Sequence, residues 1–259
     1  HVKMIIRPFN AVFSGVLVLA FAAIILMWMM LRQKSEKMRT MTIVIICCFN
    51  IIAFFIYKFA LSHDTEFLNI NHLKHFNWFN ELPLQLCNIN MFLIPIGLLT
   101  KKRFILGFSF FVAPLGAVMA LLFPEPAFNG YSLLLPRMMG FYGTHILIFI
   151  CGVSLATLGL YRPRLSDFPG IIINVVSLTV TIHCVNLILR ATVCPHANYF
   201  FTFPVNINII NLFWSWIPVP LLYLLPGMVI LLAYMVIVWL VFAIPDEIRS
   251  IKSKHIPAQ

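Results

Sequence analysis

The sequence predicts an all-α, polytopic membrane protein that forms a single domain with seven transmembrane helices. Of its 259 residues, 61% are hydrophobic and only 10% are charged, and the mean hydropathy is +0.97. Soluble domains carry roughly 45–50% apolar and about 25% charged residues. With about 20 apolar residues per span, the chain has room for seven spans and short links, so any activity is expected inside the bilayer or at its edge.

The predicted spans are apolar runs bounded by charged residues and by Pro or Gly clusters. The first two lie on either side of a basic link, the third begins after Glu81, and the fourth lies between a basic triplet and Pro124. The fifth and sixth are separated by two arginines, and the seventh follows a long polar link. They cover residues 8–31, 41–61, 82–100, 104–123, 138–160, 169–189 and 214–243.

The basic residues predict how the spans are oriented. They concentrate in the links 32–39, 101–103 and 162–164 and in the segment 249–254, all on one side of the predicted topology. The positive-inside rule therefore predicts an outer N-terminus and a cytoplasmic C-terminus in a multi-pass protein of the cell membrane. The outer links are longer and carry most of the polar side chains, so we expect the functional face to point outward.

Composition also limits the partners. No basic run is longer than three residues, which argues against nucleic acid, and nothing in the sequence calls for a metal or a soluble cofactor. Five of the six cysteines lie in apolar stretches, so a disulfide framework is not expected. The outer loop 62–81 carries histidines and carboxylates that could ligate zinc, but without a recognised ligand spacing. Lys58 is expected to extend to the membrane interface.

The start of the third predicted span is rich in polar side chains. At about 100° per residue, one broad, inward-facing side of this helix carries Glu81, Gln85, Cys87, Asn88 and Asn90. Polar groups at membrane depth are costly and mark a cavity, an ion path or a catalytic site. The alternative is that they only hydrogen-bond neighbouring helices.

Cys87 is the candidate nucleophile because its neighbours are polar, unlike those of the other span cysteines. His145 and His183 are predicted at the same depth, and an imidazole is the usual partner that makes a thiolate available in an apolar setting. His145 follows two small residues that permit close helix approach, whereas His183 has mostly apolar neighbours. An interhelical hydrogen bond is the expected role of His183.

Short motifs along the chain resemble a known family. They are Leu82 to Cys87, Leu122 to Pro124, Phe141 to His145, and Asn198 with Tyr199 followed by Pro204. In order and spacing they resemble the YwaF family of bacterial integral membrane proteins, which is similar to the eukaryotic transmembrane protein 164 group. That group is described as cysteine-dependent acyltransferases that remodel phospholipids. The resemblance implies that Cys87 is the nucleophile and His145 its partner.

One position departs from the bacterial pattern. Bacterial members commonly have a His two residues before the motif cysteine, where this chain has Gln85. Glutamine cannot accept a proton near neutral pH, so His145 or His183 would have to act as the base.

The leading hypothesis is a cysteine-dependent acyltransferase or lipid hydrolase that acts on outer-leaflet glycerolipids through an acyl-Cys87 intermediate. Its partners would be phospholipids or lysophospholipids. The alternative is a transporter or a solute- or lipid-binding protein with a polar cavity in the outer half. A retinal receptor is excluded because the last span lacks a lysine. The residues expected to contact a substrate are Glu81, Gln85, Asn88, Asn90, His183, Asn198 and Tyr199.

Overall fold

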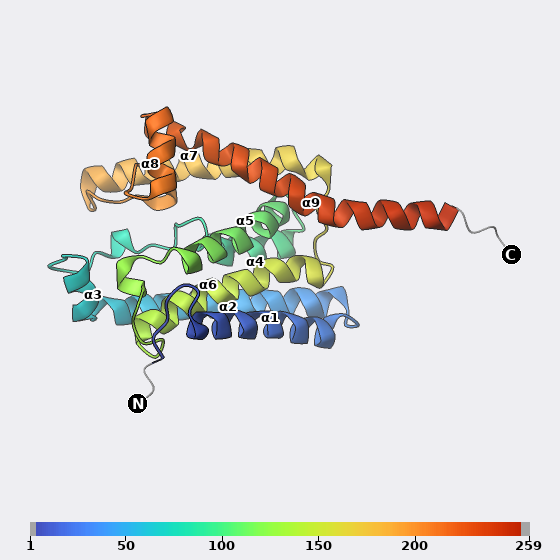
Figure 1. Cartoon of the computed structure of the whole chain (residues 1–259), viewed down its shortest axis with the longest axis horizontal. Helices are drawn as coiled ribbons and strands as arrows, with labels where there is room; N and C mark the ends of the chain where they lie inside the picture. The colour runs from blue at the N-terminus through green and yellow to red at the C-terminus, as the bar shows by residue number, and fades with distance from the viewer. Residues whose placement is uncertain (1–3, 255–259) are drawn as a thin grey trace.

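The protein is a bundle of helices that run roughly side by side along its long axis, with α8 lying across them (Figure 1). The computed structural model describes the backbone of residues 4–254 and the side chains of residues 4–245. Within this part of the chain the regular structure is helical, and an isolated bridge pairs Ile5 with Ser132. The predicted all-α class is therefore confirmed.

Six helices are long and apolar enough to cross a membrane among the described residues. Their bounds are α1 Ala11–Leu31, α2 Glu36–Ser62, α5 Arg103–Leu122, α6 Pro136–Thr157, α7 Phe168–Thr192 and α9 Leu225–Lys254. The shorter helices are α3 Thr65–Ile70, α4 Asn90–Thr100 and α8 Asn208–Trp216. The chain is thus a multi-pass membrane protein, with six rather than seven helices of spanning length in this region.

The prediction of one continuous helix over residues 82–100, the third span, is wrong. Residues 82–89 form turns, and only α4, with 11 residues, is helical. At about 1.5 Å per residue, such a helix rises roughly 16 Å, about half of the ~30 Å hydrocarbon core. The backbone and side chains of the irregular segment bind other parts of the chain instead, so the one-face helical arrangement of its polar residues does not exist.

The last predicted span also begins later than expected. The helix α8 ends at Trp216, and residues 217–221 separate it from the short 3₁₀ helix η5, Leu222–Leu224, and from α9. Pro218 and Pro220 lie in this break. Proline lacks a backbone N–H and clashes with the preceding turn, which explains why the apolar run starting at Trp214 does not form one helix.

Helix α6 is the centre of the packing and contacts α5 and α2 most extensively. Close approach to α5 depends on Gly152, because a Cβ atom there would lie 2.8 Å from Cδ of Pro114. Phe108, Phe111 and Ile148 fill the core between these helices. Helices α7, α8 and α9 form a separate layer on the other side of α5 (Figure 1), and few side chains of α9 are buried in its part up to Pro245.

The basic links meet at one end of the bundle. Lys101 pairs with Glu36 at 3.3 Å. Arg103 binds both oxygens of Asp167, at 3.0 and 2.6 Å, and Arg39 donates to the Leu158 carbonyl. The links 32–39, 101–103 and 162–164 therefore share one end, as the predicted topology requires, whereas the side chains of residues 249–254 lie outside the described residues.

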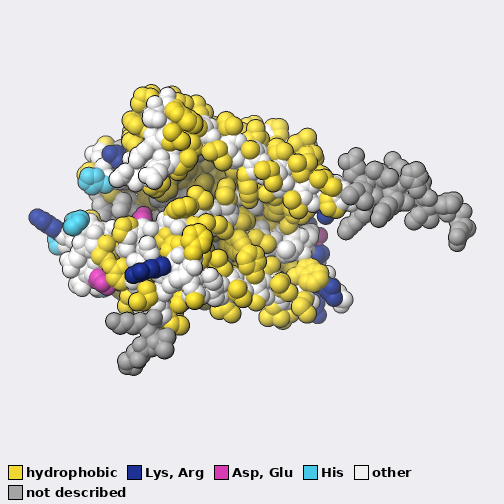
Figure 2. All heavy atoms as spheres, viewed as in Figure 1, with side chains coloured by type: hydrophobic (Ala, Val, Ile, Leu, Met, Phe, Trp, Pro, Cys, Tyr) yellow, Lys and Arg dark blue, Asp and Glu magenta, His cyan; other side chains and the backbone are white. Residues whose placement is uncertain are grey.

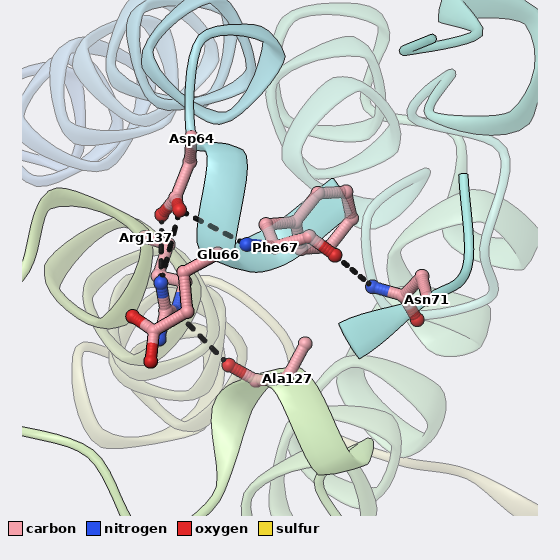
Figure 3. A network of polar contacts seen from close by, with 6 residues as sticks. All are labelled: Asp64, Glu66, Phe67, Asn71, Ala127 and Arg137. Atoms are coloured by element: carbon pink, nitrogen blue, oxygen red, sulfur yellow. Dashed lines mark hydrogen bonds and ion pairs between the residues drawn. The ribbon is translucent and has the colours of Figure 1, made fainter. Parts of the chain in front are cut away.

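The opposite end is joined by the buried guanidinium of Arg137 (Figure 3). The Arg137 side chain is 1% exposed and binds Asp64 at 2.8 Å and Glu66 at 2.8 Å. Its Nε donates to the Ala127 carbonyl at 3.2 Å. The network ties the start of α3 and the short 3₁₀ helix η2, Pro126–Phe128, to the first turn of α6, so it fixes the end of α6 that leads to His145.

The two carboxylates of this network, Asp64 and Glu66, should contribute differently to the free energy of unfolding. We expect Asp64→Asn to lower the free energy of unfolding by about 1.5–3 kcal/mol, because hydrogen bonds to a buried charge are lost. Glu66→Gln should cost less than about 1 kcal/mol, because the Glu66 side chain is 53% exposed. Thermal unfolding in detergent measures both, and equal losses would contradict this ranking.

The same network predicts that the stability of the protein depends on pH in the acidic range. Burial acts to raise the pKa of Asp64, but hydrogen bonds from Arg137 and the Phe67 N–H outweigh it, so the pKa lies below its ordinary value of 3.8. The stabilisation from Asp64 is therefore complete above that value and is lost as the pH falls through the lowered pKa. The melting temperature of the wild type should fall more steeply than that of Asp64→Asn over this acidic range.

The orientation can be tested by labelling single cysteines at the two ends. Lys102 and Lys74 are both exposed and belong to links predicted on opposite sides of the membrane. In a variant without native cysteines, an impermeant maleimide should label Lys74→Cys in intact cells. It should label Lys102→Cys only after permeabilisation, and the reverse result would invert the topology.

A buried cysteine and histidine at a break between helices

Cys87 and His145 lie in contact in the interior. Cys87 belongs to the irregular segment before α4 and His145 to α6, and the two residues are 9% and 6% exposed. The distance from Sγ of Cys87 to Nε2 of His145 is 3.3 Å. Nδ1 of His145 lies 2.7 Å from the Phe141 carbonyl. That carbonyl can only accept, so the bond assigns the ring hydrogen to Nδ1 and leaves Nε2 free to accept the thiol hydrogen.

The segment that carries Cys87 is held between two layers. Leu86 and Ile89 pack both against the core of α5 and α6 and against the cluster around α7. Gly116 of α5 lies beside the cysteine, where an added Cβ atom would be 3.4 Å from Cβ of Cys87. The absence of a side chain at this position allows α5 to approach the segment closely.

Gln85 and Tyr199 bind the segment to the opposite layer. Oε1 of Gln85 accepts a hydrogen bond from the Phe200 N–H at 3.1 Å. The Tyr199 hydroxyl accepts one from the Leu82 N–H at 2.8 Å and donates one to the Phe79 carbonyl at 2.9 Å. Both residues were expected to contact a substrate, and in the structure their polar atoms bind the backbone of the protein itself.

The 3₁₀ helix η4, Tyr199–Phe201, is supported by side chains that sequence reasoning missed. Phe200 and Phe201 have left-handed backbone angles, with φ of 57° and 49°, which cost energy for residues other than glycine. The Asn186 side chain binds the N–H and the carbonyl of Tyr199, at 2.9 and 2.8 Å, and the Tyr223 hydroxyl donates to the Phe203 carbonyl at 2.9 Å. Asn198 is used in the same way and binds both backbone groups of Phe203 at 2.9 Å.

Three asparagines lie in the interior around the Cys87 segment and α6. Oδ1 of Asn88 lies 3.8 Å from the Cys87 sulfur. Nδ2 of Asn90 donates to the Leu86 carbonyl at 2.8 Å, and Nδ2 of Asn50 donates to the Thr144 carbonyl at 3.3 Å. The Oδ1 atoms of Asn90 and Asn50 are enclosed without a hydrogen-bond partner among the described residues. Asn50 was not singled out by the sequence, although an amide within an apolar span was an available signal.

Lys58 does not extend to the membrane interface as expected. Its side chain is 9% exposed, and Nζ lies 2.5 Å from Oε2 of Glu81 and 4.6 Å from the centre of the Tyr57 ring. Because Glu81 offers a half-buried carboxylate nearby, the ion pair replaces hydration of the ammonium group.

A further carboxylate, Glu125, immediately precedes the 3₁₀ helix η2. The residue is exposed. Partial desolvation by the surrounding protein, and secondarily the charge of Glu81, raise the pKa of Glu125, while the charge of Lys58 opposes the shift.

His183 lies apart from Cys87 on α7. Its ring packs 5.1 Å from that of Phe203, and its enclosed Nδ1 has no hydrogen-bond partner among the described residues. The interhelical hydrogen bond expected at His183 is therefore absent at Nδ1. Of the two histidines that sequence depth could not separate, the structure brings only His145 to the cysteine.

A comparison with known protein families identifies the family of this chain. The model of the TMEM164 family matches residues 7–244. The chain belongs to the TMEM164 family. The resemblance expected from the short motifs is thereby confirmed for this family over nearly the whole chain. No curated protein and no solved structure matches the sequence.

The loop 62–81 of this TMEM164 family member does not gather a set of metal ligands. Among the described residues, no three His, Cys, Asp or Glu side chains lie close enough to hold a metal ion. Asp64 and Glu66 are bound to Arg137 instead. Nδ1 of His63 stays at the end of its own helix, 3.0 Å from the Phe59 carbonyl.

An apolar groove lies between α8 and the start of α9, away from Cys87. Its volume is about 550 Å³, and it is lined by Ile209, Leu212, Phe213, Trp216, Ile217, Leu225, Pro226, Val229 and Ile230. The space-filling view shows that apolar side chains also cover much of the face formed by α8 and α9 (Figure 2). Such a surface suits contact with lipid tails.

Two glycines of α6 provide a matched test of how closely α6 approaches α2. A Cβ atom at Gly140 would lie 2.1 Å from Cγ of Tyr57, whereas one at Gly143 would meet nothing within 4 Å. We expect Gly140→Ala to destabilise the protein by about 1–3 kcal/mol through overpacking. Gly143→Ala should be neutral or stabilising by up to about 1 kcal/mol, because alanine favours a helix interior.

Thermal unfolding of the two TMEM164 variants in detergent measures this difference. Equal stability would mean that the Tyr57 ring moves aside without cost.

Proposed function

We propose that this TMEM164 family protein is a cysteine-dependent acyltransferase or lipid hydrolase of the cell membrane that acts on outer-leaflet glycerolipids. The observation that carries the proposal is the 3.3 Å contact between the Cys87 sulfur and Nε2 of His145. A nucleophile beside a base that is itself oriented by a third group is the recurring arrangement of covalent catalysis. In this site the Phe141 carbonyl is the orienting group.

The chemistry follows from the assigned tautomer. Nε2 of His145 accepts the thiol proton as the Cys87 sulfur attacks the carbonyl carbon of an acyl ester. The tetrahedral intermediate then collapses with cleavage of the ester C–O bond, and the departing lysolipid oxygen takes the proton from Nε2. The resulting acyl thioester transfers its chain to the hydroxyl of a lysolipid or to water, and His145 again removes and returns the proton.

The hydrogen bonds narrow the choice of donors for the oxyanion. The amide nitrogens of Asn90 and Asn198 already donate to the Leu86 and Phe203 carbonyls. Asn88 lies next to the sulfur and its amide nitrogen is not committed to such a bond. It is therefore the best placed of the three to donate to an oxygen that develops beside Cys87.

The transport alternative has less support. It requires a cavity lined by Glu81, Gln85, Asn90 and their neighbours, but these side chains bind Lys58, Phe200 and Leu86. Polar groups that are paired within the protein do not offer a solute path, so their main effect is to hold the irregular segment in place.

The two histidines and the cysteine provide the test. With vesicles of a phosphatidylethanolamine and phosphatidylcholine mixture that carries a labelled acyl chain, the wild type should form a hydroxylamine-sensitive label on Cys87. Cys87→Ala should abolish the label and lipid turnover, and His145→Ala should reduce turnover by about 10²–10⁴-fold. His183→Ala is the matched control and should leave turnover nearly unchanged.

Each variant is first checked for thermal stability so that misfolding is not read as lost chemistry. Wild-type turnover by Cys87→Ala would rule out the covalent mechanism. A larger loss in His183→Ala than in His145→Ala would remove His145 from the role of base.

A further inference from the structure

The imidazole of His145 depends on packing for its orientation. Its Nδ1 lies 2.7 Å from the Phe141 carbonyl, and its Nε2 lies 3.3 Å from the Cys87 sulfur. A carbonyl oxygen accepts hydrogen bonds over a broad range of directions, and the outer side-chain torsion of histidine has broad energy wells. The bond to the Phe141 carbonyl therefore sets the tautomer of the ring more strictly than its tilt.

The side chain of Phe141 restricts that tilt. Phe141 lies four residues before His145 on α6, and side chains at this spacing lie on the same face of a helix. Their ring centres are 4.5 Å apart, with an angle of 47° between the ring planes. This distance is at the short end of the range for interacting aromatic rings. Because Phe141 itself is only half-buried, the position of its ring depends on a further neighbour.

Phe128, in the 3₁₀ helix η2, is that neighbour. Its ring stacks on the Phe141 ring with a centre-to-centre distance of 4.5 Å and an angle of 10°, and the residue is 5% exposed. The Phe128 carbonyl accepts a hydrogen bond from the Tyr142 hydroxyl at 3.3 Å. The preceding Ala127 carbonyl accepts one from Nε of Arg137 at 3.2 Å (Figure 3). Two side chains of α6 thus hold the backbone of η2 in place, and with it the stacked ring.

We propose that Phe128 is a positioning residue that acts through the Phe141 ring to hold Nε2 of His145 against the Cys87 sulfur. A general base must stay within hydrogen-bond reach of the proton that it removes, and a misplacement of about 1 Å can lower a rate by about 10²-fold. Without the stack, the Phe141 ring is free to turn and the imidazole tilts away from the sulfur. This inference rests on the proposed roles of Cys87 and His145.

The test measures the alkylation rate of Cys87 in the full chain in detergent, at one pH near neutrality. Iodoacetamide modification of the peptide that contains Cys87 is followed by mass spectrometry, with exposed Cys184 as the internal reference. Phe128→Leu keeps an apolar side chain but removes the stack. Because a well-placed imidazole accepts the thiol proton, this variant should modify Cys87 about 2- to 10-fold more slowly, the range that corresponds to loss of an aromatic pair.

The same substitution in a His145→Ala background separates positioning from packing. Looser packing or easier entry of the reagent would change the Cys87 rate in both backgrounds, whereas an effect that passes through His145 disappears when the imidazole is absent. We therefore expect Phe128→Leu to slow alkylation only when His145 is present.

A matched control is Phe13→Leu. Phe13 is a buried phenylalanine of the same apolar cluster, and its ring lies 6.1 Å from that of Phe9. The substitution should leave the Cys87 rate unchanged. In the assay with labelled lipid vesicles, Phe128→Leu should lower kcat by a similar factor to the alkylation rate and leave KM unchanged, because Phe128 acts on the base and not on the lipid.

An equal change in both backgrounds would overturn the proposal, as would a wild-type alkylation rate in folded Phe128→Leu. If Phe128→Leu does not fold, Phe141→Leu breaks the same stack from α6, keeps the backbone carbonyl, and decides the question by the same comparison. A wild-type rate in His145→Ala alone would remove His145 as the base and the proposal with it. A rate loss that depends on His145, without any lipid turnover, would instead refute the proposed enzymatic function and leave the positioning role of Phe128 intact.

Discussion

The arrangement of this protein depends on satisfying the backbone of a non-helical segment inside a membrane bundle. Non-helical backbone at this depth is tolerated only where protein or water meets its polar groups. Residues 82–89 meet the requirement with turns of their own and with bonds from η4, including those of Gln85 and Tyr199. The layer formed by α7 and η4 is therefore a condition for the position of Cys87.

The same requirement explains why so many polar residues of the interior do not face a cavity. Asn186 and Asn198 hold the strained turn around Phe200, and Asn90 binds the carbonyl of Leu86. Each of these bonds replaces one that a helix would have provided internally. Cys87 and His145, by contrast, contact each other through Sγ and Nε2.

Charge and packing are distributed along the molecule in a complementary way. Apolar side chains dominate the contact of α5 with α6, and the basic links meet at one end through Lys101, Arg103 and Arg39. At the other end, Arg137 and Lys58 are buried with carboxylate partners. Burying a charge costs much less when a partner lies within hydrogen-bond distance, so loops that look solvated in sequence become part of the interior.

The sequence by itself determined the membrane class, the helices α1, α2, α5, α6 and α7 to within a few residues, and the family. These features depend on long apolar runs and on the position of charge, which are local properties of the chain. It also indicated Cys87 and His145, because a cysteine with polar neighbours and a histidine within a span are both unusual in an apolar segment. The common end of the basic links followed from the positive-inside rule without a structure.

Only the tertiary structure decided that residues 82–89 leave the helix, that His145 and not His183 reaches Cys87, and that Lys58 turns inward to Glu81. The physical reason is the same in all three cases. Each outcome depends on a partner distant in sequence, namely Tyr199 for Leu82, Cys87 for His145, and a carboxylate 23 residues away for Lys58. Local propensity and predicted depth describe a residue's own segment. The free-energy cost of burying a polar group depends instead on the hydrogen-bond or charge partner that another segment provides.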